Sequence, residues 1–174
     1  MTVNALVSIS CPDRVGIVSA ATGCLFELGA NLGDTTFAVL GEAAEFSSVV
    51  EVPPGVTPGD IDAALRRLPE LSNAEISVAL FELEPVRGQS GQVNYRITVS
   101  GGDRPGLIAR LSEVFVEFKV NIVRLNAERI IAEDNAQYAV IMAVYIPEEN
   151  VRSCLATVAN TAGGLGLYCE WEKV

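Results

Sequence analysis

An internal repeat is the feature of this 174-residue sequence that most restricts its fold. At an offset of 90 residues, the segment Asp-Arg-Val-Gly at 13–16 aligns with Asp-Arg-Pro-Gly at 103–106, and Asn31 aligns with Asn121. Positions 2–34 and their counterparts share eight identities in 33 positions, whereas background residue frequencies would give about two or three. The sequence therefore predicts one structural unit built twice.

The first half of each copy predicts a strand followed by a helix. Apolar residues alternate over 3–10 and over 93–100, the period of a strand with one buried face. After each Asp-Arg-x-Gly segment, apolar residues recur at helical spacing. These helical positions are Ile17, Ala21, Cys24, Leu25 and Leu28 in one copy and Leu107, Leu111, Val114, Phe115 and Phe118 in the other.

The second half of each copy predicts a hairpin, a helix and a last strand. The hairpins are expected to begin at Asn31 and Asn121. Thr57, followed by Pro58 and by Asp60, has the hydroxyl cap, early proline and acidic residue typical of a helix start. The expected elements are second hairpin strands at 46–52 and 137–146, helices from 57 and from 148 to about 160, and last strands at 74–83 and 165–173.

The order strand, helix, strand, strand, helix, strand predicts an α+β fold of two tandem ferredoxin-like βαββαβ domains. Each domain is expected to be an antiparallel four-stranded sheet with two helices on one face. We assign residues 1–84 to domain 1 and 92–174 to domain 2. Residues 85–91, rich in helix and strand breakers, are the predicted linker.

The charge of the chain argues against polyanionic partners. The net charge is −10 and the isoelectric point is about 4.4, so direct binding to nucleic acid or to an anionic membrane is not expected. Residues 1–87 hold 12 acidic and 4 basic side chains. A basic partner would therefore be attracted more strongly to this half of the chain than to the other. No apolar run approaches the roughly 18 residues of a membrane span, and the sequence predicts a cytoplasmic protein.

The content of histidine and cysteine argues against a catalytic function. The sequence has no histidine, which excludes Ser-His-Asp and Cys-His arrangements and zinc sites that contain histidine. The four cysteines, Cys11, Cys24, Cys154 and Cys169, include no Cys-x-x-Cys pair, so reduced thiols in the core are expected. The chain is therefore predicted to be no enzyme and to carry no metal or cofactor.

The repeated Asp-Arg-x-Gly segments are the candidate functional residues. Each lies where a strand ends and a helix begins, where unpaired helix amides favour a carboxylate. Glycine allows close approach, an aspartate can accept from an ammonium group, and the asparagines can donate and accept. These groups suit a free amino acid. A purely structural reading remains open, in which aspartate caps the helix, arginine is solvated and asparagine accepts a turn conformation.

The loop, the helix and the asparagine that begins the hairpin resemble ACT domains, the amino-acid-sensing modules of many biosynthetic enzymes. The resemblance covers essentially the whole chain as two copies, and a free-standing pair is similar to the glycine cleavage system repressor group. By position, the resemblance implies ligand contacts at an interface between two ACT domains. The implied residues are Asp13, Arg14, Val15, Gly16, Asn31, Leu32, Asp103, Arg104, Pro105, Gly106, Asn121 and Ile122.

The resemblance implies a non-catalytic protein that senses a small amino acid, glycine or serine, and regulates metabolism or transcription through a protein partner. It is compatible with a homodimer. One departure concerns the loops: Cys11-Pro12 precedes the first, whereas Gly101-Gly102 precedes the second. We therefore expect the second loop to be more flexible, and the two sites need not both bind.

Three alternatives stay open. The chain could be a protein-interaction module whose ligand pocket is vestigial, acting through its acidic half or an open sheet edge. Acylphosphatases share the fold class and use a loop arginine and a strand asparagine, superficially like Arg14 and Asn31, but their Gly-x-Val-Gln-Gly loop is absent here. The chain could also be a regulatory remnant of a formyltetrahydrofolate deformylase, in which ACT pairs precede a catalytic domain.

Overall fold

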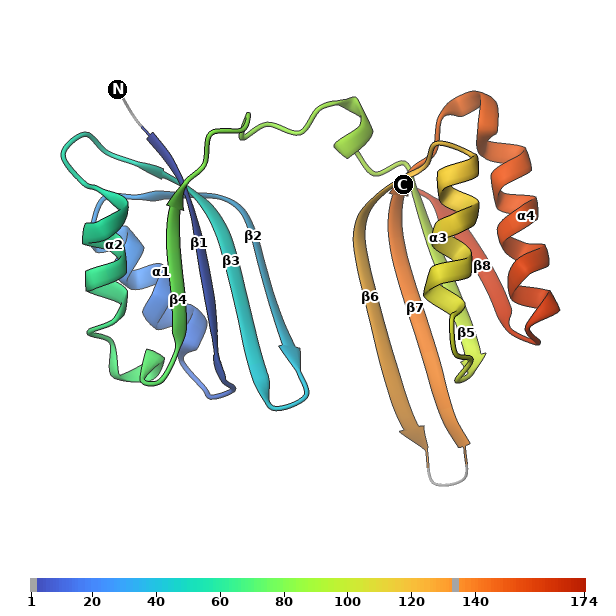
Figure 1. Ribbon diagram of the computed structural model, residues 1–174, viewed down its shortest axis with the longest axis horizontal. Helices are drawn as coiled ribbons and strands as arrows, with labels where there is room; N and C mark the ends of the chain where they lie inside the picture. Colours follow the sequence, from blue (N-terminus) through green and yellow to red (C-terminus); the bar gives the residue numbers. More distant parts are fainter. Residues whose placement is uncertain (1–2, 133–134) are drawn as a thin grey trace. The chain divides into compact units, whose positions relative to one another are not determined.

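The computed structural model describes residues 3–132 and 135–174. The chain divides into two compact units between Val86 and Arg87, and each is described by itself. In each unit, two helices cover one face of a four-stranded antiparallel sheet (Figure 1). The predicted α+β class, with two ferredoxin-like βαββαβ domains in tandem, is confirmed.

The first domain has the sheet order β2-β3-β1-β4. Its elements are β1 (Val3–Pro12), α1 (Ile17–Glu27), β2 (Asn31–Leu40), β3 (Ala43–Val52), α2 (Pro58–Leu65), η1 (Pro69–Leu71) and β4 (Glu75–Leu80). The first strand alternates between buried and more exposed residues, as its apolar period predicts. The two central strands, β1 and β3, pair along their whole length from Val3 opposite Val52 to Pro12 opposite Ala43.

The second domain repeats this topology with the order β6-β7-β5-β8. Its elements are η2 (Gln89–Gly91), β5 (Tyr95–Gly102), α3 (Leu107–Glu117), β6 (Asn121–Ala132), β7 (Asn135–Tyr145), η3 (Glu148–Asn150), α4 (Val151–Gly164) and β8 (Tyr168–Lys173). Both edge strands that begin with an asparagine carry an irregularity in register just after it, between Leu32 and Thr35 and between Ile122 and Arg124.

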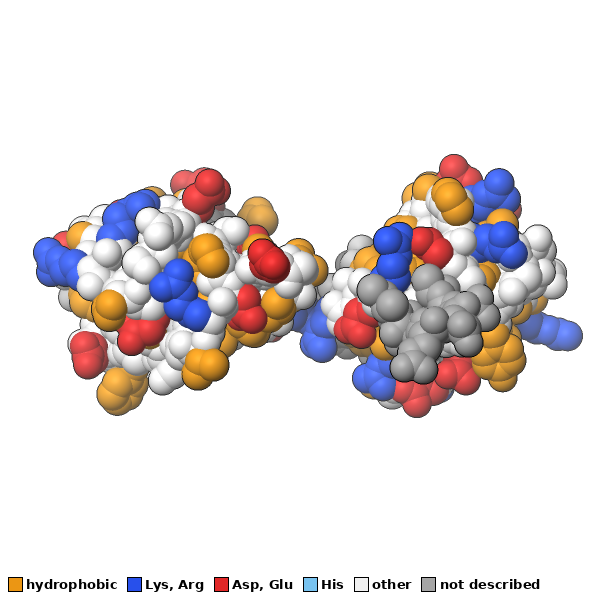
Figure 2. All heavy atoms as spheres, turned by 90° about the horizontal axis from the view of Figure 1, so that it is seen from below, with side chains coloured by type: hydrophobic (Ala, Val, Ile, Leu, Met, Phe, Trp, Pro, Cys, Tyr) orange, Lys and Arg blue, Asp and Glu red, His pale blue; other side chains and the backbone are white. Residues whose placement is uncertain are grey.

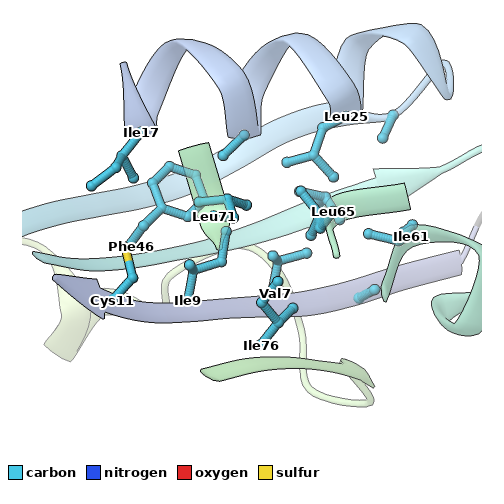
Figure 3. Close-up of a cluster of buried hydrophobic side chains, with 14 of the residues drawn as sticks. Val7, Ile9, Cys11, Ile17, Leu25, Phe46, Ile61, Leu65, Leu71 and Ile76 are labelled. Carbon is cyan, nitrogen blue, oxygen red and sulfur yellow. The ribbon is translucent and has the colours of Figure 1, made fainter. Parts of the chain in front are cut away.

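The core of the first domain lies between its sheet and its helices (Figure 3). Val7, Ile9 and Phe46 of the sheet meet Ile17 and Leu25 of α1, and all five are at most 1% exposed. Fully burying such a side chain contributes about 1.5–3 kcal/mol. The predicted helical stripe is therefore the face of α1 that holds the helix on the sheet.

The second domain has a separate core of the same design. Leu111 and Phe115 of α3 are buried against Ile97, Val99 and Met142 of the sheet. All four cysteines, which fall in the described ranges, are free thiols, and Cys11 and Cys154 are buried. Burial raises the pKa of Cys154 to about 11, so this side chain serves as a small apolar core residue.

Several boundaries differ from the predicted ones. The first strand runs two residues further than expected, to Pro12, and β5 includes Gly101 and Gly102. The last strand of the first domain is shorter, from Glu75 to Leu80. The segment at 85–91 contains a short 3₁₀ turn, η2. Pairing with neighbouring strands sets these ends, and strand pairing is invisible to local periodicity.

Candidate functional site

The first candidate loop is held in place by its own backbone and by neighbouring segments. Gly16 has φ 101°, in the left-handed region, and its carbonyl accepts from the Ala20 amide at 2.8 Å to start α1. The amide of Asp13 donates to the Glu42 carbonyl at 2.8 Å, which ties the loop to the β2–β3 hairpin. A glycine is therefore favoured at 16 by the backbone conformation itself.

The side chain of Arg14 does not extend freely into solvent. Its Nη1 donates to the Ser72 Oγ at 2.9 Å and its Nη2 to the Ser72 carbonyl at 3.3 Å. Ser72 follows η1, 58 residues further along the chain. This contact joins the loop to the residue that follows η1, and Arg14 is still an exposed surface side chain, as the structural interpretation expects.

The second candidate loop has the same backbone but a different bracing contact. Gly106 has φ 81° and its carbonyl accepts from the Arg110 amide at 3.0 Å to start α3. Here the aspartate is engaged, because Arg129 of β6 donates to the Asp103 carboxylate. The amide of Leu107 bonds to the carbonyl of Arg104 at 3.2 Å.

Neither aspartate caps its helix. No side chain of the described residues accepts a hydrogen bond at the start of α1 or α3. Apart from the Leu107 amide, which donates to the Arg104 carbonyl, the first-turn amides therefore retain the capacity to bind an anion. The structural interpretation in which Asp13 and Asp103 cap the helices is therefore wrong. Carboxylate binding by the loops stays a prediction.

The two asparagines lie far from the loops of their own domains. Asn31 pairs with Glu51, and Glu51 pairs with Asn4 near the start of β1. Asp13 is nine residues beyond Asn4 along the same strand direction, a separation of roughly 30 Å at the rise of an extended strand. Figure 1 shows β2 starting at the end of the sheet opposite to the turn from β1 into α1.

The same separation holds in the second domain. Ile122, next to Asn121, pairs with Val144, which pairs with Tyr95 at the start of β5. The loop at 103–106 follows the other end of β5. Within one domain, the structure therefore brings the Asp-Arg-x-Gly residues together but does not bring them to the asparagine.

The hydrogen bonds of the two asparagines differ. The Nδ2 of Asn121 donates to the Ser90 carbonyl in η2 at 2.7 Å. Asn31 is exposed, and its side chain has no hydrogen bond to any described residue. Leu32 is half-buried against the first core, and Ile122 packs in the same way against the second.

The loop residues at the third position face solvent in both copies. Val15 is fully exposed, and Pro105 is exposed as well.

A hollow of about 740 Å³ runs from Pro105 and Gly106 along α3 to Thr161 of α4, with Arg110 and Glu113 in its lining. A second hollow, of about 480 Å³, lies beside the first loop and is lined in part by Cys11, Glu42 and Asn73. Figure 2 shows acidic and basic side chains interspersed on the visible end of the first domain.

One of the two glycines before the second loop, Gly101, has a packing role. Gly101 has φ 147°, and a Cβ there would lie 2.6 Å from the Leu167 Cδ2. Gly101 and Gly102 pair with Tyr138 and Gln137 of β7. Gly101 and Gly102 therefore belong to a paired strand, and the greater flexibility of the second loop stays a prediction.

Sequence reasoning missed four residues that contact the candidate site: Glu42, Ser72, Ser90 and Arg129. No local pattern marks them, since each reaches its partner only through tertiary structure.

In the described part of the chain, no group of histidine, cysteine, aspartate and glutamate side chains could hold a metal ion. None of the helices described is long and apolar enough to cross a membrane.

The combination of arginine and asparagine expected of an acylphosphatase is not formed in this fold. Arg14 bonds to Ser72 beyond the end of β1, whereas Asn31 starts β2 beside Glu51 at the opposite end of the sheet. A single reacting group cannot contact both side chains within one domain, because roughly 30 Å separates the two ends.

No protein-family model and no curated protein matches the sequence. Among solved structures, an unknown protein from Galdieria sulphuraria matches with a TM-score of 0.81 and 23% identity, covering 100% of this chain and 99% of that one. A structure provisionally described as a glycine cleavage system transcriptional repressor matches with a TM-score of 0.70 and 15% identity, covering 100% and 98%. An ACT domain protein from Streptococcus pneumoniae matches 46% of this chain and 91% of its own length, with 22% identity and a TM-score of 0.41.

At these identities the likeness concerns the fold, and it extends over the whole chain in the first two cases. The order of elements, the sheet topology and the repeated β–α loop agree with it. The chain therefore shares the fold of these two structures over its whole length, with two ferredoxin-like βαββαβ domains in one polypeptide.

Proposed function

We propose that this chain is a non-catalytic regulatory protein that binds a small amino acid and acts through a protein partner. The observation that carries the proposal is the repeated β–α loop, in which a glycine in the left-handed region precedes an 11-residue helix. Among the described residues, no side chain caps the first turn of either helix. Such a loop offers backbone donors and a helix dipole to a carboxylate. The whole-chain likeness to a structure described as a transcriptional repressor supports a regulatory role.

The ligand chemistry follows from the groups at hand. The carboxylate of an amino acid would meet the amides around Gly16 or Gly106, and its ammonium group an aspartate or asparagine oxygen. Glycine and serine are the ligands that the resemblance to ACT domains implies, and we take them as the proposed amino acids.

A site that uses a loop and an asparagine together requires two domains, because each domain holds them at opposite ends of its sheet. The two domains can come from one chain or from two copies, and in the second case the protein is a homodimer. We propose the set Asp13 to Gly16 with Asn31 and Leu32, and Asp103 to Gly106 with Asn121 and Ile122, as the residues from which such a site is drawn.

Isothermal titration calorimetry with each of the twenty amino acids tests the proposal. Binding of glycine or serine is expected, and Gly16→Leu together with Gly106→Leu should abolish it by blocking approach to the helix amides. Binding should also raise the melting temperature, since a ligand selective for the folded state stabilises it. A matched control is Gly23→Leu, at an exposed position within α1 where an added Cβ meets no described atom.

Failure of all twenty amino acids to bind the unmutated protein would refute the sensing proposal. The second candidate, a protein-interaction module with a vestigial pocket, would then replace it. The contacts that already engage Arg14, Asp103 and Asn121 favour that alternative, because a vestigial site keeps its residues in structural roles.

A further inference from the structure

The last strand of the first domain has one edge without a partner strand. The sheet order β2-β3-β1-β4 places β4 at the margin of the sheet, where it pairs with β1. The amide of Phe81 donates to the Asn4 carbonyl at 2.8 Å. In an antiparallel pair, residues that bond to the neighbouring strand alternate with residues whose backbone groups point away from it. The amides and carbonyls of Ile76, Val78 and Leu80 therefore lie on the free edge of β4.

One of these backbone groups already has a partner. The Nη2 of Arg66 donates to the Ile76 carbonyl at 2.9 Å, which agrees with a carbonyl that points away from β1. Among the described residues, none bonds to the amide or carbonyl of Val78 or of Leu80 on that edge. Both residues thus offer a donor and an acceptor to another strand.

The equivalent strand of the second domain protects its free edge with charge. Charged side chains on an edge strand oppose pairing with another chain. The strand β8 carries Glu170, Glu172 and Lys173, whereas Glu75 is the charged residue of β4. From Ile76 to Leu80 the strand β4 is uncharged. The two copies of the repeat therefore differ at this edge, and the edge of the first domain is the one open to pairing.

A second copy of β4 fits this free edge. Two antiparallel β4 strands can pair around a two-fold axis at Ala79, with Val78 of each strand opposite Leu80 of the other. This register uses the free amides and carbonyls of both strands and leaves the Ile76 carbonyl with Arg66. At the axis, Ala79 of one chain lies opposite Ala79 of the other in a non-hydrogen-bonded pair, where side chains are closest and small ones fit.

The charges beside the edge are complementary in the same register. Ile76, and with it the guanidinium of Arg66, lies opposite Glu82 of the second copy. Glu82 is exposed, and its side chain has no ion pair with any described residue. The alternation of β4 places Glu82 on the same sheet face as Leu80, the face that the helices cover. A chain with a net charge of −10 can approach its own copy most closely at such a segment.

We propose that β4 of the first domain is the surface through which two copies of this chain associate, so that their four-stranded sheets join into one continuous sheet. The inference goes beyond the proposed function, since no loop residue or asparagine of the amino-acid site takes part in the contact. An edge contact buries little surface, so the dimer is expected to form in a concentration-dependent equilibrium.

Sedimentation velocity of the full chain over about 1 to 200 µM measures the association. Leu80→Pro removes an amide on the free edge, where proline is tolerated because the strand β1 does not use that donor. Association should weaken by about tenfold or more, since each copy loses a hydrogen bond. Lys173→Pro is the matched control on the free edge of β8, and it should associate as the wild type does. A wild type that stays monomeric over this range, or a dimer that Leu80→Pro leaves unchanged, would overturn the proposal.

Charge substitutions at Ala79 test the register and decide the question even if Leu80→Pro does not fold. Ala79→Arg and Ala79→Glu each place like charges opposite one another at the axis, so each variant alone should be monomeric. An equal mixture should form the mixed dimer in native mass spectrometry, because opposite charges across an antiparallel pair stabilise it. Ser77→Arg and Ser77→Glu are the matched pair, and mixing them should not favour a mixed dimer, since Ser77 lies opposite Phe81 of the second copy. Dimers of either Ala79 variant alone, or no mixed dimer, would contradict this register.

Discussion

At the residue scale, glycines have two different structural roles in this chain. Gly16 and Gly106, at equivalent positions of the repeat, adopt positive φ where a strand turns into a helix. Gly101 instead allows the side chain of Leu167 to approach the backbone of β5. The first role could be inferred from the repeated motif. The second could not, because Leu167 lies 66 residues away in sequence.

Gly101→Ala is expected to destabilise the second domain by about 1 to 3 kcal/mol, the range for overpacking. The added methyl would lie 2.6 Å from a Leu167 atom in the packed core, at a φ that side chains rarely adopt. Urea denaturation followed by circular dichroism measures the change. Gly102→Ala is the matched control, since a Cβ there meets no described atom within 4 Å. An equal effect of both variants would contradict the packing role.

At the element scale, the helices differ in how they begin. The predicted cap of α2 is confirmed: the Thr57 hydroxyl accepts from the Asp60 amide, and Asp60 accepts from the Thr57 amide at 2.8 Å. The helices α1 and α3 begin at left-handed glycines without such a cap from any described residue. The helix α4 also begins without a side-chain cap at Asn150, so the capping box distinguishes α2 from the other three α-helices of the described residues.

Thr57→Ala is expected to lower the free energy of unfolding by about 1 kcal/mol at neutral pH. Hydrogen bonds from the side chain and backbone of Thr57 lower the pKa of Asp60 below its usual value of 3.8. A lowered carboxyl pKa stabilises the fold above the unfolded-state pKa, and the contribution is lost as the pH falls through the folded-state pKa. The difference between variant and wild type should therefore shrink below about pH 4.

Urea denaturation at pH 7 and near pH 3 measures this dependence. Thr22→Ala is the matched control, because the Thr22 hydroxyl bonds to the Val18 carbonyl within its own helix at 2.8 Å and involves no carboxylate. A Thr57→Ala effect that stays constant across this pH range would show that Asp60 takes no part in the cap.

At the scale of the whole molecule, charge decides which partners the chain can meet. The net charge is −10, and the chain divides into two small units that each have their own core. A net charge of this sign repels phosphates, whose neutralisation by basic side chains accounts for non-specific affinity for nucleic acid. A regulatory role in transcription would therefore require a protein partner.

The purified protein is accordingly expected not to shift a random DNA duplex in a gel at about physiological salt, where screening acts over about 8 Å. The measurement is an electrophoretic mobility shift over a range of protein and salt concentrations. A basic DNA-binding domain serves as the positive control. A shift that weakens as salt rises would contradict the prediction, since it would reveal direct contacts with phosphates.

The sequence by itself determined the repeat, the order of elements and the faces of the helices. Ile17 and Leu25 in one copy and Leu107 and Phe115 in the other lie at helical spacing and are buried as expected. Such patterns are local, so periodicity and capping rules can read them. The positions of the loop residues at the ends of β1 and β5 followed from the same patterns.

Tertiary structure alone decided how those residues are used. The strand order places Asn31 and the Asp13 loop at opposite ends of one sheet, although only 18 residues separate them in sequence. Contacts distant in sequence brace Arg14 with Ser72 and give Asn121 a partner in the linker. These choices depend on which strands pair and in which register, and pairing is a property of the folded chain that no local pattern encodes.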